Sequence, residues 1–73
     1  MDHYPGSAIV AEAAKAIEAK RSVALIINGL SEPVTITGIR AEKAFAYCDD
    51  GLAYWLVRLD ALVGYRSWVP PKE

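Results

Sequence analysis

The sequence predicts an α+β fold, in which an N-terminal helix is followed by a bent four- to five-stranded antiparallel small barrel. Residues 8–20 are rich in Ala, Glu and Lys, which favour helix formation. From Ser22 onward, short β-branched and aromatic runs alternate with turn signals, a pattern typical of several short strands. Gly38 interrupts one of these runs, where a small barrel requires a sharp bend.

The helix is expected over residues 8–20, with Ser7 as its N-cap after the helix-breaking pair Pro5-Gly6. Small and aliphatic residues recur at helical spacing along one side. This side should dock on the sheet rather than bind a partner protein, because a sheet with apolar residues on both faces needs a cover. A helix of about three turns is marginal in water by itself, so its stability should depend on that docking.

Two strands are expected next. Residues 23–27 are apolar on both faces and should form the central strand, which ends at the turn-forming pair Asn28-Gly29. Residues 34–39 alternate apolar and polar side chains, so one face of this strand should meet solvent or a partner. Residues 40–43 should then form a polar turn.

A β-hairpin is expected in the second half of the chain. Two strand-like runs, residues 44–48 and 52–57, flank the sequence Asp49-Asp50-Gly51. Aspartates and glycine together favour a tight turn, and Gly51 can adopt the positive φ that other residues resist.

The chain should close with one helical turn and a last strand. Residues 58–62 are too few for a full helix, but Asp60 can cap a single turn that directs Leu59 and Leu62 inward. The last strand is expected over residues 63–69, before two consecutive prolines.

Size and charge exclude several classes of protein. The 73 residues suffice for one domain, residues 1–73, with residues 1–7 and 70–73 expected to fray. Eight Lys and Arg against nine Asp and Glu give a net charge of −1, so no long-range field attracts the chain to nucleic acid or anionic membranes. No leader or membrane-spanning pattern is visible, and we expect a cytoplasmic protein.

The sequence offers no parts for conventional catalysis or metal binding. His3 should be a solvated terminal residue, and Cys48 a buried small hydrophobe whose thiol pKa is raised by Asp49 and Asp50. These two aspartates are explained as turn residues. One Cys and one His give no zinc-site spacing, and nucleophile, Walker and dinucleotide motifs are missing from the sequence. We therefore expect no enzyme activity, no cofactor and no metal.

Aromatic rings and cations occur together in the barrel region, as in proteins that bind single-stranded nucleic acid. The expected contacts are Arg40, Lys43, Tyr54 and Arg58, with Tyr47 and Trp55 on neighbouring strands. Aromatic residues of so small a barrel also fill cores and interfaces, and that alternative stays open.

Tyr65 and Trp68 are the candidate interface residues. They stand three apart, so they face opposite sides of a strand and at least one should lie outside the core. With 53% apolar residues, the chain has more apolar surface than so small a domain can bury. Pairing of edge strands between copies would cover such a residue, and we expect a homo-oligomer.

The segment Lys20 to Gly29, KRSVALIING, is similar to the end of the helix and the first strand of the bacterial Sm-like RNA chaperones, the Hfq family. Gly38-Ile39 resembles the glycine-hydrophobic step of that family's second strand, and residues 59–70 resemble its final strands. The resemblance implies an Sm-like barrel, related to Src-homology-3 barrels, whose subunits join strand to strand in a ring that binds RNA.

The chain departs from this family in two places. The turn after Gly29 is longer, and Trp55-Leu56-Val57 stand where the family has a Tyr-Lys-His signature. The residues that would line one RNA site are therefore absent.

Three functions remain open from the sequence. The first is a non-enzymatic oligomeric module that binds RNA or single-stranded DNA. The second is a protein-interaction module that uses an exposed sheet edge or aromatic face. The third is an enzyme whose site forms only in an oligomeric pore.

Overall fold

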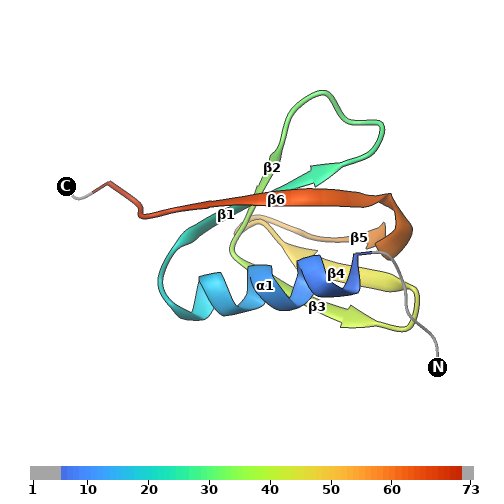
Figure 1. Cartoon of the computed structure of the whole chain (residues 1–73), viewed down its shortest axis with the longest axis horizontal. Coiled ribbons are helices and arrows are strands. Elements are labelled where there is room, and N and C mark those ends of the chain that lie inside the picture. The colour runs from blue at the N-terminus through green and yellow to red at the C-terminus, as the bar shows by residue number, and fades with distance from the viewer. Residues whose placement is uncertain (1–5, 72–73) are drawn as a thin grey trace.

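The computed structural model describes residues 6–71 (Figure 1), so His3 and parts of both ends predicted to fray lie outside the described residues. The elements in chain order are α1 (Ser7–Glu18), β1 (Ser22–Ile27), β2 (Val34–Ile36), β3 (Gly38–Glu42), β4 (Phe45–Asp49), β5 (Tyr54–Arg58), the 3-10 turn η1 (Leu59–Ala61) and β6 (Leu62–Trp68). The predicted α+β class, with one N-terminal helix before antiparallel strands, is confirmed.

The six strands form two three-stranded antiparallel sheets, not the closed barrel that was expected. One sheet has the order β2-β1-β6 and the other β3-β4-β5. The chain passes between the sheets twice, at Thr37 between β2 and β3 and through η1 between β5 and β6. Because η1 turns the chain before β6 begins, β5 and β6 do not pair with each other. Each of them remains the outer strand of its own sheet.

The expected strand over residues 34–39 is divided, and the division falls beside Gly38 as predicted. The amide of Thr37 donates a hydrogen bond to the carbonyl oxygen of Asp49 at 2.7 Å, and its hydroxyl donates to the same oxygen at 3.1 Å. Val34 to Ile36 pair with β1, whereas Gly38 begins the pairing with β4. One continuous segment therefore belongs to both sheets.

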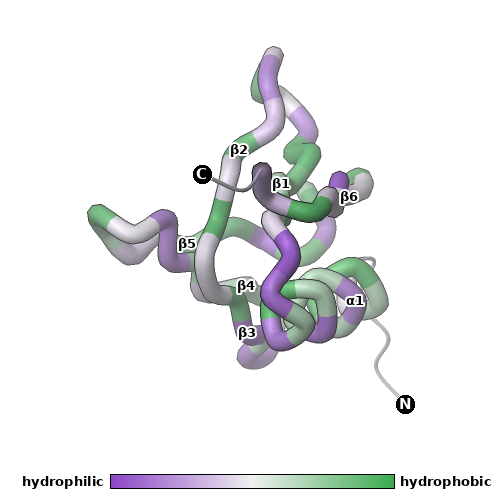
Figure 2. The backbone as a smooth tube through the Cα atoms, turned by 90° about the vertical axis from the view of Figure 1, so that its left-hand side faces the viewer, coloured by the Kyte–Doolittle hydropathy of each residue, from purple (hydrophilic) through white to green (hydrophobic). Residues whose placement is uncertain are grey.

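Helix α1 docks on the sheets as predicted. It packs against β3, β6 and β1, and its Val10 and Ala13 are buried. Figure 2 shows the helix beside the strands. The helix start differs from the expectation: Gly6, with φ of 99°, is the N-cap, and no side chain of residues 6–71 caps the helix. Ser7 is instead the first helical residue, because the left-handed backbone that leads into the helix is open only to glycine at this position.

The core lies between the two sheets and the helix. Its largest fully buried side chains are Val23 and Leu25 from β1, Cys48 from β4 and Leu59 from η1. β1 is the central strand of its sheet, as its apolar sequence predicted. The predicted single helical turn is present as η1, and the prediction that Leu59 and Leu62 face inward is confirmed, because both are buried.

Two local expectations were wrong. Residues 40–42 continue β3 instead of forming a turn, because Lys43 adopts a positive φ of 57° and closes a tight hairpin in which Glu42 pairs with Phe45. Asp60 does not cap η1; its carboxylate instead accepts hydrogen bonds from the side chain of Arg58.

Among residues 6–71, no helix combines the length and the apolar character needed to cross a lipid bilayer.

The contact between the helix start and η1 gives a test of this packing. A Cβ at Gly6 would overlap the carbonyl oxygen of Leu59 and lie 3.2 Å from the Cβ of Leu62, in addition to adopting a strained φ. Gly29 has a similar φ of 96°, but a Cβ at this position would have no neighbour within 4 Å among the described residues. We expect Gly29→Ala to cost about 1–2 kcal/mol of unfolding free energy and Gly6→Ala about 3 kcal/mol or more. Urea unfolding monitored by tryptophan fluorescence measures both, and equal losses would contradict the proposed contact.

Candidate functional site

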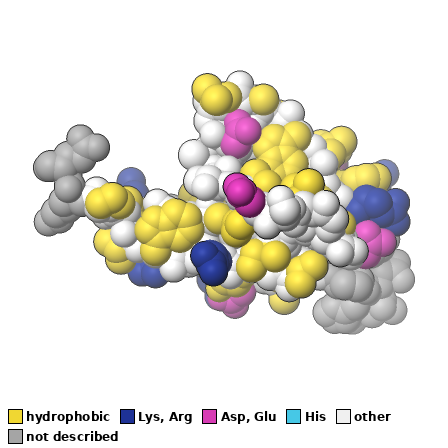
Figure 3. Space-filling view, turned by 90° about the horizontal axis from the view of Figure 1, so that it is seen from above, with side chains coloured by type: hydrophobic (Ala, Val, Ile, Leu, Met, Phe, Trp, Pro, Cys, Tyr) yellow, Lys and Arg dark blue, Asp and Glu magenta, His cyan; other side chains and the backbone are white. Residues whose placement is uncertain are grey.

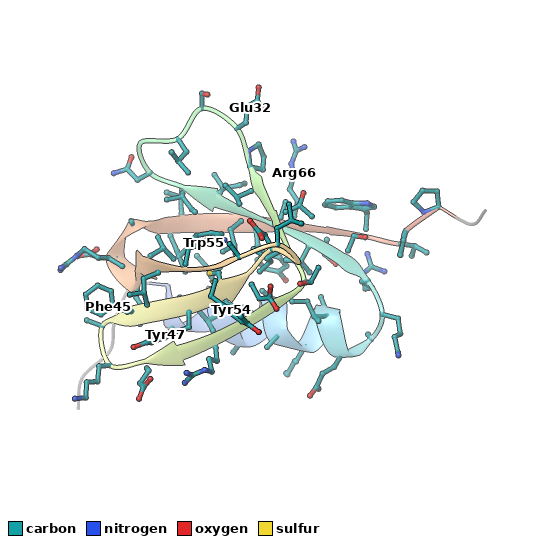
Figure 4. The ribbon with its side chains drawn as sticks, turned by 180° about the vertical axis from the view of Figure 1, so that it is seen from behind. Glu32, Phe45, Tyr47, Tyr54, Trp55 and Arg66 are labelled. Atoms are coloured by element: carbon teal, nitrogen blue, oxygen red, sulfur yellow. The ribbon has the colours of Figure 1, made fainter. Side chains whose placement is uncertain are left out.

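The outward face of the sheet β3-β4-β5 carries three cross-strand rows of side chains. These rows are Gly38–Asp49–Tyr54, Arg40–Tyr47–Leu56 and Glu42–Phe45–Arg58. We call this surface the aromatic platform. The alternate residues of the same strands, such as Ala46 and Cys48, are buried in the core. Figure 4 shows the rings of Phe45, Tyr47 and Tyr54 on this side of the molecule, away from the loop that carries Glu32.

Each arginine of the platform lies over an aromatic ring. The guanidinium carbon of Arg40 is 4.6 Å from the centre of the Tyr47 ring, and that of Arg58 is 5.9 Å from the centre of the Phe45 ring. Both distances fall within the range of cation–π attraction. The contacts hold cations and rings at one surface, which is the arrangement that stacking and phosphate recognition both use.

Each arginine is also paired with an acid. Nη1 of Arg40 lies 3.2 Å from a carboxylate oxygen of Glu42, and Arg58 donates two hydrogen bonds, of 3.1 and 3.2 Å, to Asp60. The hydrogen bonds from Arg58 lower the pKa of Asp60. All four groups are exposed, so these pairs contribute little to stability, but they partly compensate the positive charge of the platform.

A hollow of about 460 Å³ opens on the platform, and we call it the Gly38 hollow. Its lining includes Gly38 and Arg40 from β3, Tyr47 and Asp49 from β4, and Tyr54 from β5. Gly38 has no side chain, which leaves the end of the first row open. The hollow therefore combines two phenol rings with one basic and one acidic group.

The Asp49-Asp50-Gly51 hairpin is confirmed, and its hydrogen bonds explain the two aspartates. Oδ1 of Asp49 accepts a hydrogen bond from the amide of Gly51 at 2.8 Å. Oδ1 of Asp50 accepts from the amides of Leu52 and Ala53, at 2.9 and 2.8 Å, and these bonds lower the pKa of Asp50. Gly51 has a φ of 91°, as a turn glycine requires.

The platform brings together three of the four residues predicted to contact nucleic acid. Arg40, Tyr54 and Arg58 lie on it, and Lys43 lies in the hairpin turn at its end. Trp55 faces the other way and packs half-buried against the core.

Sequence reasoning missed two exposed members of the platform, Phe45 and Leu56. Both residues alternate with buried or half-buried residues along β4 and β5, and this alternation in the sequence could have predicted that they are exposed. The Gly38 hollow was also missed, because it depends on the register of three strands.

The two candidate interface residues differ in burial. Tyr65 packs against the core, whereas Trp68 is 39% exposed at the end of β6. The same end is tied to the start of β1, because Nε of Arg21 donates a 2.7 Å hydrogen bond to the hydroxyl of Ser67. The exposed ring therefore sits on an ordered outer strand.

Cys48 is only 1% exposed, which confirms it as a buried small side chain. Burial raises the pKa of its thiol to about 11. The direction agrees with the prediction, but the cause is removal from water rather than the neighbouring aspartates. Within residues 6–71, no group of three or more His, Cys, Asp or Glu side chains is placed to hold a metal ion.

In the view from above in Figure 3, the Lys and Arg side chains of the described residues lie apart from one another among apolar ones. The chain matches no protein-family model, and comparisons with curated proteins and with solved structures also give no match. The site must therefore be interpreted from its own geometry.

The raised pKa of Cys48 predicts a loss of stability at alkaline pH. Below pH 9 the thiol is protonated in both the folded and the unfolded chain. Between pH 9 and about 11 it ionises only when unfolded, so the free energy of unfolding should fall by about 2–3 kcal/mol across this range. Urea titrations at several pH values measure this fall. In Cys48→Ala the decrease should be smaller by that amount, since this variant differs from the wild type only in lacking the thiol, and parallel curves would contradict the assignment.

Proposed function

We propose that this protein is a non-enzymatic binding module that holds RNA or single-stranded DNA on the aromatic platform. The observation that carries this proposal is the convergence of Arg40, Tyr47, Tyr54 and Arg58 on one sheet face. Every nucleobase has a π face, so exposed rings bind single strands with little sequence preference, at about 1–3 kcal/mol per stacked base. Tyr54 is 84% exposed and is therefore open to stacking.

The backbone of the strand would run past the three cations of the same region. Arg40 and Arg58 project from the first and last strands of the sheet, and Lys43 lies at the turn between β3 and β4. Few phosphates can be contacted, and both arginines share their charge with an acid. The proposed affinity of a single copy is accordingly modest.

We also propose that copies of the chain assemble through their outer strands. β5 and β6 each have one side without a strand partner in the described chain, and Trp68 is exposed on β6. Unpaired strand edges and exposed aromatic rings are both covered when a second copy adds its edge. Assembly of this kind is also what an Sm-like arrangement implies, and it would place several platforms in one particle.

Salt and substitution together test the nucleic-acid proposal. With Arg40, Lys43 and Arg58 near phosphates, a plot of log affinity against log salt should have a slope of about −2, and Lys43→Gln should reduce it by about 0.7. Tyr54→Ala should weaken binding about tenfold through the lost stacking. Leu30→Ala is the control, since Leu30 is 54% exposed on the other sheet's loop. Fluorescence anisotropy with a labelled oligouridine measures all four proteins.

A protein partner is the second candidate, and the apolar residues around the platform favour it. Leu52 is 96% exposed and Leu56 55% exposed, while the platform arginines, Arg40 and Arg58, are already paired with acids. An apolar protein interface should be insensitive to salt. Absence of oligonucleotide binding at low salt would remove the nucleic-acid proposal and leave this one.

The assembly proposal predicts a particle heavier than the 7.9 kDa chain. Light scattering at micromolar concentration should give a multiple of this mass, and Trp68→Lys should shift it towards one copy, because a charge cannot be buried in a strand-edge contact without large desolvation cost. Leu30→Lys, at an apolar loop position that is 54% exposed, should leave the mass unchanged. A wild-type particle of one chain would refute the assembly.

A further inference from the structure

On the basis of the proposed function, we infer that the Gly38 hollow is a base-binding site that selects guanine. Its volume, about 460 Å³, lies within the range of sites that hold small organic ligands. The rings of Tyr47 and Tyr54 come from adjacent strands and line the same hollow. Arg40 lies over the Tyr47 ring, whereas Tyr54 is 84% exposed, so a planar base can stack on Tyr54 beside the arginine. The open position at Gly38 leaves room for the edge of the base.

The hollow contains opposite charges that do not neutralise each other. Arg40 and Asp49 both line it, from positions diagonally across the pairing of β3 with β4. Among the described residues, Arg40 is paired with Glu42 and not with Asp49. A ligand with donors on one edge and acceptors on another would satisfy both groups at once.

Hydrogen-bonding capacity remains on both groups. The guanidinium uses Nη1 for Glu42, which leaves its other N–H groups, and Asp49 uses Oδ1 for the amide of Gly51. No hydrogen bond within residues 6–71 involves Oδ2 of Asp49. The hollow thus presents an acidic acceptor and a basic donor to a ligand that stacks on Tyr54.

Guanine is the base whose edges match this pair. It offers two adjacent donors, N1–H and the N2 amino group, to a carboxylate, and two acceptors, O6 and N7, to a guanidinium. Uracil and cytosine place acceptors beside their donor, where a carboxylate repels them. Adenine has one amino donor beside an acceptor. The carboxylate of Asp49 therefore selects guanine, and Arg40 adds to the selection.

The test uses RNA nonamers of uridine with a single central G, A, C or U, read by fluorescence anisotropy. The nonamer with G should bind about tenfold more tightly than the all-uridine one. Asp49→Asn keeps an oxygen for the Gly51 amide but places an amino group against the donors of guanine. This variant should lose most of the preference for the nonamer with G and should bind the all-uridine RNA as wild type does.

Asp50→Asn is the matched control, since it removes the same charge one residue away from a side chain that does not line the hollow. It should retain the guanine preference. Gly38→Ala provides a second variant, because a Cβ there meets nothing closer than 3.7 Å and the backbone is not strained. The added methyl should reduce the preference for guanine while leaving the protein folded.

The outcomes separate this inference from the function on which it rests. If no nonamer binds, the proposed function fails. If all bind but the nonamer with G has no advantage, or if Asp49→Asn retains that advantage, the function stands and the guanine site is refuted. A preference for A or C would refute it as well.

Discussion

The structure depends on the short segment from Ile36 to Gly38, where the chain leaves one sheet and enters the other. Ile36 is the last residue of β2 and pairs with β1, and Gly38 already pairs with β4. Between them, Thr37 directs both its amide and its hydroxyl to the carbonyl oxygen of Asp49. That shared acceptor fixes where the two sheets diverge. It also fixes the end of β4, and thereby the position of Asp49 and the hairpin turn relative to Gly38. The hollow on the platform is a direct result of this junction.

The platform shows how a small domain uses both faces of one sheet. Residues that alternate along β4 either enter the core, as Ala46 and Cys48 do, or reach the surface as the rings of Phe45 and Tyr47. An arginine lies over each of these two exposed rings, and each arginine is paired with a neighbouring acid. This layering keeps a ring-rich surface nearly neutral. For the binding proposed above, such a surface favours shape and stacking over charge, in agreement with the net charge of −1.

Much of the fold could be predicted from local sequence because local chemistry determines it. The central strand follows from the apolar run 23–27, the hairpin from Asp49-Asp50-Gly51, and the strand division from Gly38. The expected barrel was wrong, because whether β5 and β6 pair depends on the path of η1, which the local sequence does not determine. The site was predictable only in part. Arg40 and Tyr54 were proposed as contacts because of their side-chain chemistry. The strand register that places them around one hollow depends on pairing between segments distant in the sequence.

The buried thiol has a practical consequence for the chemistry of this chain. Cys48 is its single cysteine, so any disulfide must join two molecules. In the folded protein the sulfur is shielded from oxidants, and its high pKa keeps it protonated at neutral pH. Two such sulfurs can meet only after both polypeptides have opened. A covalent dimer that appears on a non-reducing gel therefore records molecules that were denatured, not molecules that were associated in their native state.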